Sequence, residues 1–316
     1  MNKYSFLAVL VFIALSSLRG YAQSNPPPSV LEGVNSKTLL TSNQPTLMIP
    51  YATLENVPMV SFSGSRELSW VRHYAFNPVE VETYPRAIAM DAQGNVYLTG
   101  HISSDVLVTK YTNQGELIWM RQFVEASYTA GEGVDITIDT NGNAYVAARF
   151  SKVYPVNKSN IGLLKYSVSG NLLWESLDSL ILSDLSSVPL KLFLYGDYIY
   201  VAGTAYQPGY GADFLLEKID TLGNFVWFRR FNTSGNNYEW IRDFVIDSDG
   251  NSVILGRTNS STLSPDICVV KYDQNGQLLW SYIYDYQGGT EEPFALAIDS
   301  QNNIIISGHT FSPGQA

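Results

Sequence analysis

The sequence predicts an all-β protein, a β-propeller of four-stranded blades, and three observations support this fold class. First, the ten-residue stretch at 271–280, Lys-Tyr-Asp-Gln-Asn-Gly-Gln-Leu-Leu-Trp, has relatives at 110–119, 165–174 and 218–227. Second, the 316-residue chain holds 21 Tyr, 14 Phe and 24 Gly, which suits short strands joined by tight turns. Third, short apolar runs separate the turn signals. Repetition at intervals of 53 to 55 residues indicates a repeat architecture.

Each repeat begins with an apolar run that ends in Asp, and a tight turn follows. The turn reads Asp-x-x-Gly-Asn at residues 91–95, 139–143 and 247–251, with variants at 195–197 and 302–303. Gly and Asn tolerate the positive φ that hairpin turns need. We therefore expect a hairpin between the first two strands of each blade, capped by the Asp. A Ca²⁺ loop of the EF-hand kind is excluded because no copy has its ligand spacing.

The second half of each repeat predicts two further strands, joined by a Lys-Tyr-x-x-x-Gly turn and followed by Trp. These runs are apolar on both faces, so both faces of each sheet must be covered. Four-stranded sheets of this kind, repeated radially, form a β-propeller. We expect the Trp residues to pack on the outer strand, with the indole N–H bonded to a carbonyl group. We expect the repeated lysines to join a structural Lys–Asp network; they are Lys110, Lys165, Lys218 and Lys271.

The combined pattern, Asp-x-x-Gly-Asn-x-Tyr-x-x-Gly and then Lys-Tyr-x-x-x-Gly-x-x-x-Trp, resembles the secreted bacterial β-propeller repeat family known as SBBP. The resemblance covers residues 58–312 in five repeats. It implies a propeller of exported or surface proteins and no shared catalytic residues. The Gly-x-x-x-Trp part is also similar to the docking motif of quinoprotein propellers. The fuller Ala-x-Asp-x-x-Thr-Gly spelling is missing, so we expect no cofactor.

The first 22 residues predict a secretory signal peptide. Lys3 precedes an apolar run at 6–15, and Gly20 and Ala22 provide small residues before a cleavage site. The run is too short to span a bilayer, and the alternative is a buried N-terminal strand. Residues 23–57 are rich in Pro, Ser and Asn and predict a linker, and residues 58–316 hold the repeats. We expect a secreted or cell-surface protein with no membrane span.

Closure of the propeller has two interpretations. The fifth repeat ends after its second strand, near Ser312. Residues 59–70 match the third and fourth strands of the other repeats, so they could complete a five-bladed ring. Alternatively, the chain is a piece of a larger propeller. Closure would remove two exposed sheet edges, which an open arc would leave.

Charge and motifs exclude several functions. The chain has 29 acidic and 19 basic residues, a net charge of −10, which argues against a nucleic-acid partner. The only cysteine, Cys268, lies in an apolar run and predicts a packing role. His101 and His309 share a register position and could bind a metal only if their blades were adjacent; structural roles are the alternative. No motif of a serine hydrolase, zinc site or phosphate loop is present.

Strand direction places the hairpin turns on one rim and the long, unequal loops on the other, which we call the variable rim. Loops of this kind usually carry function. Acidic residues recur there before the first strands, with aromatic neighbours that include Tyr84, Tyr128 and Tyr286. Such a set could hold a hard cation or a carbohydrate, or simply be solvated charge. The candidate binding residues are Glu82, Glu132, Tyr238, Glu239, Trp240, Glu291 and Glu292. The sequence assigns no particular metal.

Two functions follow as expectations. The first is a non-catalytic recognition, adhesion or scaffold module with a protein or carbohydrate partner. The second is a carbohydrate-active hydrolase or lyase that uses acidic and aromatic residues of the variable rim. Fold alone does not decide between them. An aromatic pocket that holds two carboxyl groups with raised pKa values would favour the enzyme.

Overall fold

A computed structural model describes 11–12, 83–152, 158–177, 186–207, 211–233, 238–259, 265–286 and 288–311. The chain divides into two compact units, one formed by residues 1–15 with 75–316 and the other by residues 16–74. All described residues belong to the first unit. Glu82, the predicted linker, the closing segment 59–70 and most of the predicted signal peptide lie outside the described residues. Within the described part, no helix is long and apolar enough to cross a membrane.

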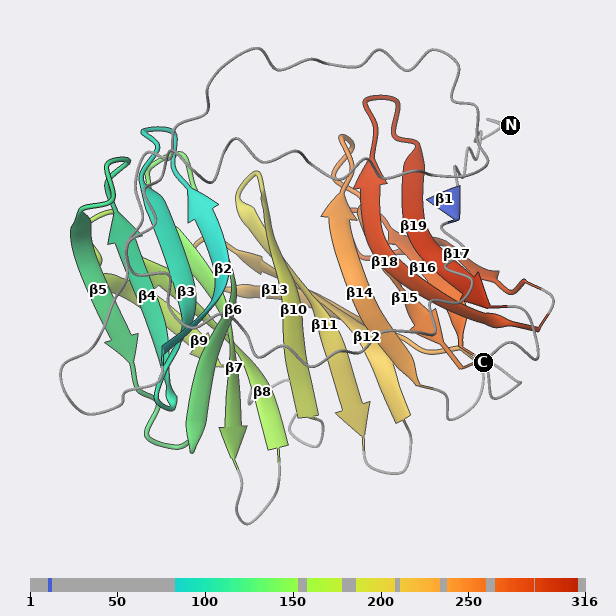
Figure 1. Cartoon of the computed structure of the whole chain (residues 1–316), viewed down its shortest axis with the longest axis horizontal. Helices are drawn as coiled ribbons and strands as arrows, with labels where there is room; N and C mark the ends of the chain where they lie inside the picture. Colours follow the sequence, from blue (N-terminus) through green and yellow to red (C-terminus); the bar gives the residue numbers. More distant parts are fainter. Residues whose placement is uncertain are drawn as a thin grey trace, which may run out of the picture. The chain divides into compact units, whose positions relative to one another are not determined.

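The described chain forms four four-stranded antiparallel sheets and a partial fifth, which confirms the predicted blades (Figure 1). Blade 1 holds β2 (Thr83–Met90), β3 (Val96–Ile102), β4 (Asp105–Tyr111) and β5 (Leu117–Phe123). Blade 2 holds β6 (Ala130–Ile138), β7 (Ala144–Lys152), β8 (Lys158–Tyr166) and β9 (Leu172–Leu177). Blade 3 holds β10 (Ser186–Tyr195), β11 (Tyr198–Gln207), β12 (Gly211–Asp220) and β13 (Phe225–Phe231). Blade 4 holds β14 (Glu239–Ile246), β15 (Ser252–Thr258), β16 (Asp266–Tyr272) and β17 (Leu278–Tyr284).

Blade 5 holds β18 (Thr290–Ile298) and β19 (Ile304–Phe311). The short strand β1 (Val11–Phe12) pairs in parallel with Ser307 and Gly308 of β19. The first strands of consecutive blades contact one another in chain order, β2 with β6, β6 with β10, β10 with β14 and β14 with β18. We call the interface between two consecutive blades a seam.

An apolar core fills each seam. The cluster between blades 1 and 2 includes Tyr97, Trp119, Phe150 and Leu164, and similar clusters occupy the next three seams. In blades 1 to 4 the second and third strands are largely buried on both faces, as their continuous apolar runs predict. Cys268 lies in the cluster between blades 3 and 4, and burial raises the pKa of its thiol to about 12. The predicted packing role of this cysteine is therefore confirmed.

The hairpin turns are capped by their aspartates, as predicted. Asp247 shows the arrangement: its Oδ1 atom accepts from the backbone N–H groups of Asp249 (3.0 Å) and Asn251 (2.8 Å). Its Oδ2 atom accepts from the Asn251 side-chain amide at 2.9 Å. Gly250 follows with a φ of 78°, which explains the Gly in the motif. The same hydrogen bonds recur at Asp91, Asp139 and Asp299.

The turn aspartates predict a pH-dependent stability. Burial opposes ionisation of Asp247, but hydrogen bonds from Lys271 and Asn251 outweigh it, so its pKa lies below the ordinary value. A depressed folded-state pKa stabilises the protein above the unfolded-state pKa, about 3.9, and the contribution is lost as the pH falls. We expect Asp247→Asn to lower the free energy of unfolding by about 2 kcal/mol at pH 7. In urea titrations this difference should shrink below about pH 4.

The matched control is Asp249→Asn, a change of an exposed carboxylate in the same turn. We expect this control to alter the free energy of unfolding by less than about 0.5 kcal/mol. A penalty for Asp247→Asn that stays constant from pH 7 to pH 3 would contradict the assigned role of its charge.

The repeated Lys, Gly and Trp form one joint between consecutive blades. The Trp119 indole Nε1–H donates to the carbonyl of Val168 in the turn of the next blade, at 3.0 Å. Gly170 of that turn lies so close to the Trp119 ring that an added Cβ would come within 2.7 Å of it. The Lys165 ammonium donates to the Thr221 carbonyl, again one blade onward, at 2.8 Å. The predicted Trp–carbonyl bond is present at Trp119 and Trp174, where it crosses the seam, whereas Trp227 Nε1 has no hydrogen-bond partner among the described residues.

The predicted Lys–Asp network is present in two blades. Lys271 Nζ lies 2.7 Å from Asp247 Oδ2, and Lys110 Nζ lies 3.5 Å from Asp91 Oδ2. Both ammonium groups are largely buried, so each is paired within the joint and not available to a ligand. The lysines therefore have the structural role that the sequence predicts.

A β-bulge occurs at one register position in every first strand. In blade 1 it places one extra residue between Pro85 and Ala87. The equivalent bulges of blades 2 to 5 lie at Gly133/Asp135, Pro189/Lys191, Ile241/Asp243 and Pro293/Ala295. A bulge twists the strand and redirects the side chains beside it. Sequence analysis did not predict this feature, although it orients the residues of the variable rim.

Two half-buried aspartates just after the bulge link neighbouring first strands. Asp135 Oδ2 accepts from the backbone N–H of Leu192 in the next blade at 2.7 Å, and Asp243 Oδ2 accepts from Leu296 at 2.8 Å. Lys191 forms an ion pair with Asp243 across the intervening seam. Burial raises the pKa of Asp135 despite these hydrogen bonds. These acids are structural links and are not part of a site.

Candidate functional site

The described candidate residues lie at the variable-rim ends of the first strands. Because side chains alternate along a strand, residues next to each other face opposite sides. In each first strand, the last paired residue before the bulge is itself preceded by one residue of the rim. These five preceding residues are Tyr84, Glu132, Val188, Trp240 and Glu292, and we call them the outer row. The preceding position faces the seams and carries Glu239 and Glu291, both fully buried. The structure therefore separates the candidate glutamates into two sets with different surroundings.

Glu132 of the outer row is held by cations from two blades. Arg149, its partner on β7, donates from Nη2 to Glu132 Oε2 at 2.7 Å. Arg86, the bulged residue of blade 1, donates from Nε to Oε1. His101 Nδ1 lies 3.8 Å from the same oxygen, and its ring stacks on Tyr84 with centroids 4.9 Å apart. Both oxygens of Glu132 are thus engaged by guanidinium groups.

A small cavity of about 180 Å³ opens beside this ion-pair cluster. Its lining offers hydrogen-bond donors and acceptors together with apolar atoms. The lining residues are His101, Ser103, Ser104, Ala130, Gly131, Glu132, Arg149 and Ser151. Pockets for drug-sized ligands usually exceed about 300 Å³, so this cavity suits a single small polar unit.

Glu292 repeats the arrangement at the seam between blades 4 and 5. Arg257 donates from Nη1 to Glu292 Oε2 at 2.6 Å, and the bulged residue Arg242 donates to Oε1. His309 pairs with Glu292 in the β18–β19 register, and its ring lies against Phe294 (4.9 Å) and Phe311 (4.5 Å). Both candidate histidines therefore contact aromatic rings of their own blades, which favours the structural alternative.

Exposed aromatic rings accompany the two ion-pair clusters at the first strands of blades 1, 4 and 5. Tyr84 is 49% exposed and Trp240 is 44% exposed, and both belong to the outer row. Phe294 and Tyr238 are exposed beside them on β18 and just before β14. Side chains of this kind usually bury their apolar surface against a partner.

At the seam between blades 3 and 4, buried acids accept hydrogen bonds, although Glu239 Oε2 has no hydrogen-bond partner among the described residues. Glu239 Oε1 accepts from the backbone N–H of Thr233 at 3.1 Å and from the Thr258 hydroxyl at 3.0 Å. Asp213 accepts from the Asn232 side-chain amide at 2.5 Å and forms an ion pair with Arg230. Burial still raises the pKa of Glu239, although these hydroxyl and amide groups favour its ionised form.

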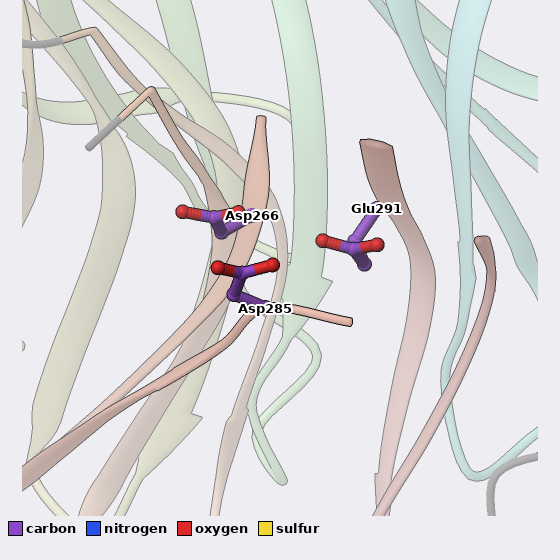
Figure 2. A group of neighbouring side chains, drawn as sticks. All are labelled: Asp266, Asp285 and Glu291. Atoms are coloured by element: carbon purple, nitrogen blue, oxygen red, sulfur yellow. The ribbon is translucent and has the colours of Figure 1, made fainter. Parts of the chain in front are cut away.

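At the seam between blades 4 and 5, three carboxyl groups come together. Asp266 begins β16, Asp285 follows β17 and Glu291 lies in β18. Each residue offers one carboxylate oxygen, and these three oxygens lie within 4.8 Å of one another. Figure 2 shows the Glu291 carboxylate facing those of the two aspartates. Of the described groups this one has the ligand set of a metal site.

Sequence analysis named Glu291 but not its two partners. The signal lies five residues before each repeated Lys, where the chain carries Asp105, Asn160, Asp213 and Asp266. This position lies at or near the start of the third strand. In blade 2 the next residue, Ile161, donates its N–H to the Ser187 hydroxyl on the first strand of blade 3 at 3.0 Å. An alignment of the repeats at this position and at the position of Glu291 could have shown that acids recur on both sides of a seam.

The repeated four-stranded sheets and their seams define the chain as a β-propeller repeat protein. Residues 118–149 match the SBBP family model, described as a beta-propeller repeat, which confirms the resemblance found in the sequence. Among curated proteins, no sequence matches the chain significantly.

Three solved structures of other proteins have a weak overall similarity to this chain. The endo-arabinase from Bacteroides thetaiotaomicron VPI-5482 has 12% identity, a TM-score of 0.41, and coverage of 73% of this chain and 89% of that one. A PL25 ulvan lyase has 10% identity, a TM-score of 0.49, and coverage of 73% and 66%. The GH43 endo-arabinanase from Bacillus licheniformis has 14% identity, a TM-score of 0.35, and coverage of 70% and 96%. At these identities and TM-scores the similarity carries no conclusion about this chain.

Proposed function

We propose that this protein is an exported, non-catalytic β-propeller that recognises a carbohydrate through its variable rim. The observation that carries the proposal is the outer row, in which exposed aromatic rings share a register with carboxylate–guanidinium pairs. Trp240 and Tyr84 offer flat apolar faces, and the Glu132 and Glu292 clusters offer fixed charged hydrogen-bonding groups. Aromatic and Arg side chains together dominate many recognition surfaces.

The cavity beside Glu132 supports a polyhydroxylated ligand. A sugar unit presents hydroxyl groups that both donate and accept, and the lining supplies partners of both kinds, among them Ser104, Ser151 and Arg149. Its volume of about 180 Å³ fits one small unit at a time. The ring of Tyr84, stacked on His101 of the lining, provides an apolar surface next to it.

The alternative of a hydrolase or lyase is less well supported. Two glutamates do have raised pKa values, Glu239 and Glu291, but both are fully buried and lie at different seams. The described glutamates of the outer row, Glu132 and Glu292, each have both oxygens bonded to arginines. A general acid must reach the substrate within hydrogen-bond distance, which buried carboxyl groups do not.

Binding by the full-length chain to a panel of soluble polysaccharides tests the proposal. We expect isothermal titration calorimetry to detect binding, and we expect Trp240→Ala to weaken it at least about tenfold, since an aromatic anchor contributes about 2 kcal/mol or more. The control is Leu279→Ala, which removes an exposed apolar side chain of the outer strand β17 and should leave the affinity unchanged.

Release of reducing ends during the same incubations separates recognition from catalysis. Binding without release would support the proposal. Time-dependent release that Glu132→Gln abolishes would overturn it and support the enzyme. A failure to bind any polysaccharide would overturn carbohydrate recognition and favour a protein partner for the outer row.

A further inference from the structure

Glu291 is a buried carboxylate without a hydrogen-bond partner. It is 0% exposed, and neither carboxylate oxygen has a partner in hydrogen-bond geometry among the described residues. Figure 2 shows it facing Asp266 and Asp285. An ionised carboxylate in such a place costs several kcal/mol unless a cation or donors compensate it. Among the described residues, none supplies such a partner to the Glu291 carboxylate.

At the neighbouring seam, between blades 3 and 4, hydrogen-bond donors offset the charge of the acid at the equivalent position. In blade 3, Arg230 and Asn232 donate to Asp213. Strand registers make Asp266 the counterpart of Asp213, and they place Ile283 and Asp285 where blade 3 has Arg230 and Asn232. At the seam between blades 4 and 5 both donors are thus replaced, one by an aliphatic side chain and one by a third acid.

We propose that Asp266, Asp285 and Glu291 bind a Ca²⁺ ion at the seam between blades 4 and 5. All three groups offer hard oxygen ligands, which Ca²⁺ prefers. Two oxygens on opposite sides of Ca²⁺ stand about 4.6–5.2 Å apart, which accommodates the spacing of up to 4.8 Å found here. Mg²⁺ spans only about 4.2 Å and requires stricter geometry, so it fits less well.

Charge within the cluster supports a bound cation. Burial raises the pKa of Glu291 to about 7, although the nearby Tyr286 amide, outside hydrogen-bond geometry, favours the ionised form. The negative charges of Asp266 and Asp285 also raise it, and among the described residues no cationic side chain opposes them. A proton on Glu291 is the other way to reduce the charge, and the experiment must distinguish the two.

The ion would join three separate segments of the rim. Asp285 follows the outer strand β17, and its Oδ1 atom accepts from Gly288 N–H within the loop at 2.7 Å. Glu291 donates its own N–H to the Pro265 carbonyl, next to Asp266, at 2.8 Å. A Ca²⁺ ion here would fix the loop that leads into β18 and hold blade 5 against blade 4. Affinities of about 10⁻⁴–10⁻³ M are typical of extracellular calcium modules.

The test uses the full-length chain, freed of metal with EDTA and dialysed at pH 8. We expect calorimetry to show one Ca²⁺ site and a much weaker response to Mg²⁺. Thermal unfolding in about 10 mM Ca²⁺ should give a melting temperature roughly 5 °C above that in EDTA. The choice of pH 8 keeps the carboxylates ionised, so an effect of protonation does not imitate the metal.

Two variants and one control follow from the comparison of seams. Asp285→Asn introduces the residue type that blade 3 carries at this position, and it should weaken Ca²⁺ binding at least tenfold. Ile283→Arg introduces the blade 3 cation and should abolish the Ca²⁺ response while it stabilises the metal-free protein. Glu239→Gln alters the corresponding glutamate of the neighbouring seam and should retain the full response.

Absence of Ca²⁺ heat and of any shift in melting temperature for the wild-type chain would overturn the proposal. So would full Ca²⁺ binding by Asp285→Asn, because the ligand would then lie elsewhere. Because Asp285 is exposed, its substitution leaves the apolar cores intact and the variant should fold. Polysaccharide binding is measured separately, so failure of the metal site and failure of the recognition surface are distinguishable.

Discussion

Replacement of Trp119 by Ala should lower the free energy of unfolding by about 3–5 kcal/mol, the largest effect that we expect from one side chain. Trp119 is only 6% exposed and packs against Tyr97 and Tyr166, with ring centroids 5.9 and 6.2 Å away. Its indole N–H also bonds to Val168 across the seam. The substitution therefore removes packing within blade 1 and the joint to blade 2. Urea denaturation followed by far-UV circular dichroism measures the loss.

Two variants separate these contributions. Trp119→Phe keeps an aromatic ring and removes the N–H donor, and we expect it to cost about 1 kcal/mol beyond the loss of volume. Trp240→Ala removes a tryptophan that is 44% exposed, and its cost should stay below about 1 kcal/mol. Equal costs for Trp119→Ala and Trp240→Ala would show that the joint does not hold the blades together.

Much of the fold was predictable because the repeated residues have a local cause. The Asp-x-x-Gly-Asn turns follow from their capping geometry, and the runs that are apolar on both faces follow from burial of the second and third strands. The regular spacing of Lys, Gly and Trp was visible in the sequence, but the contact between blades that requires this spacing was not. Gly170 and Trp119 lie in different repeats, and their contact arises only when two blades pack together.

The site was predictable only in part, for a similar physical reason. The sequence pointed to Glu132, Glu239, Glu291 and Glu292 as acids before the first strands. It could not separate the outer row from the seam positions, since that separation depends on the bulge and on strand alternation. It also could not find the arginines that bond to Glu132 and Glu292, because these come from another strand or another blade. Closure of the ring, the signal peptide and export stay predictions.

The bulge leads to the second large effect, which we expect from Gly256→Ala. Gly256 of β15 lies opposite Ile241, where the bulge of β14 brings the Trp240 carbonyl close to it. An added Cβ would collide with that carbonyl oxygen and would come within 2.5 Å of the buried Phe214 ring. Backbone and a core ring have little freedom to yield, so we expect a loss of about 3 kcal/mol in the free energy of unfolding.

Gly196→Ala is the matched control, because a Cβ there meets no atom within 4 Å. Its φ of 58° still disfavours Ala, so the cost should be about 1 kcal/mol. Urea denaturation of both variants gives the comparison. Gly256→Ala should also weaken ligand binding in proportion to the displacement of Trp240, whereas Gly196→Ala should not. If Gly256→Ala and the wild type have the same free energy of unfolding, β14 and β15 can move apart at this position without an energetic cost. The bulge would then not fix the outer row, and the rim would have to be shaped by its loops.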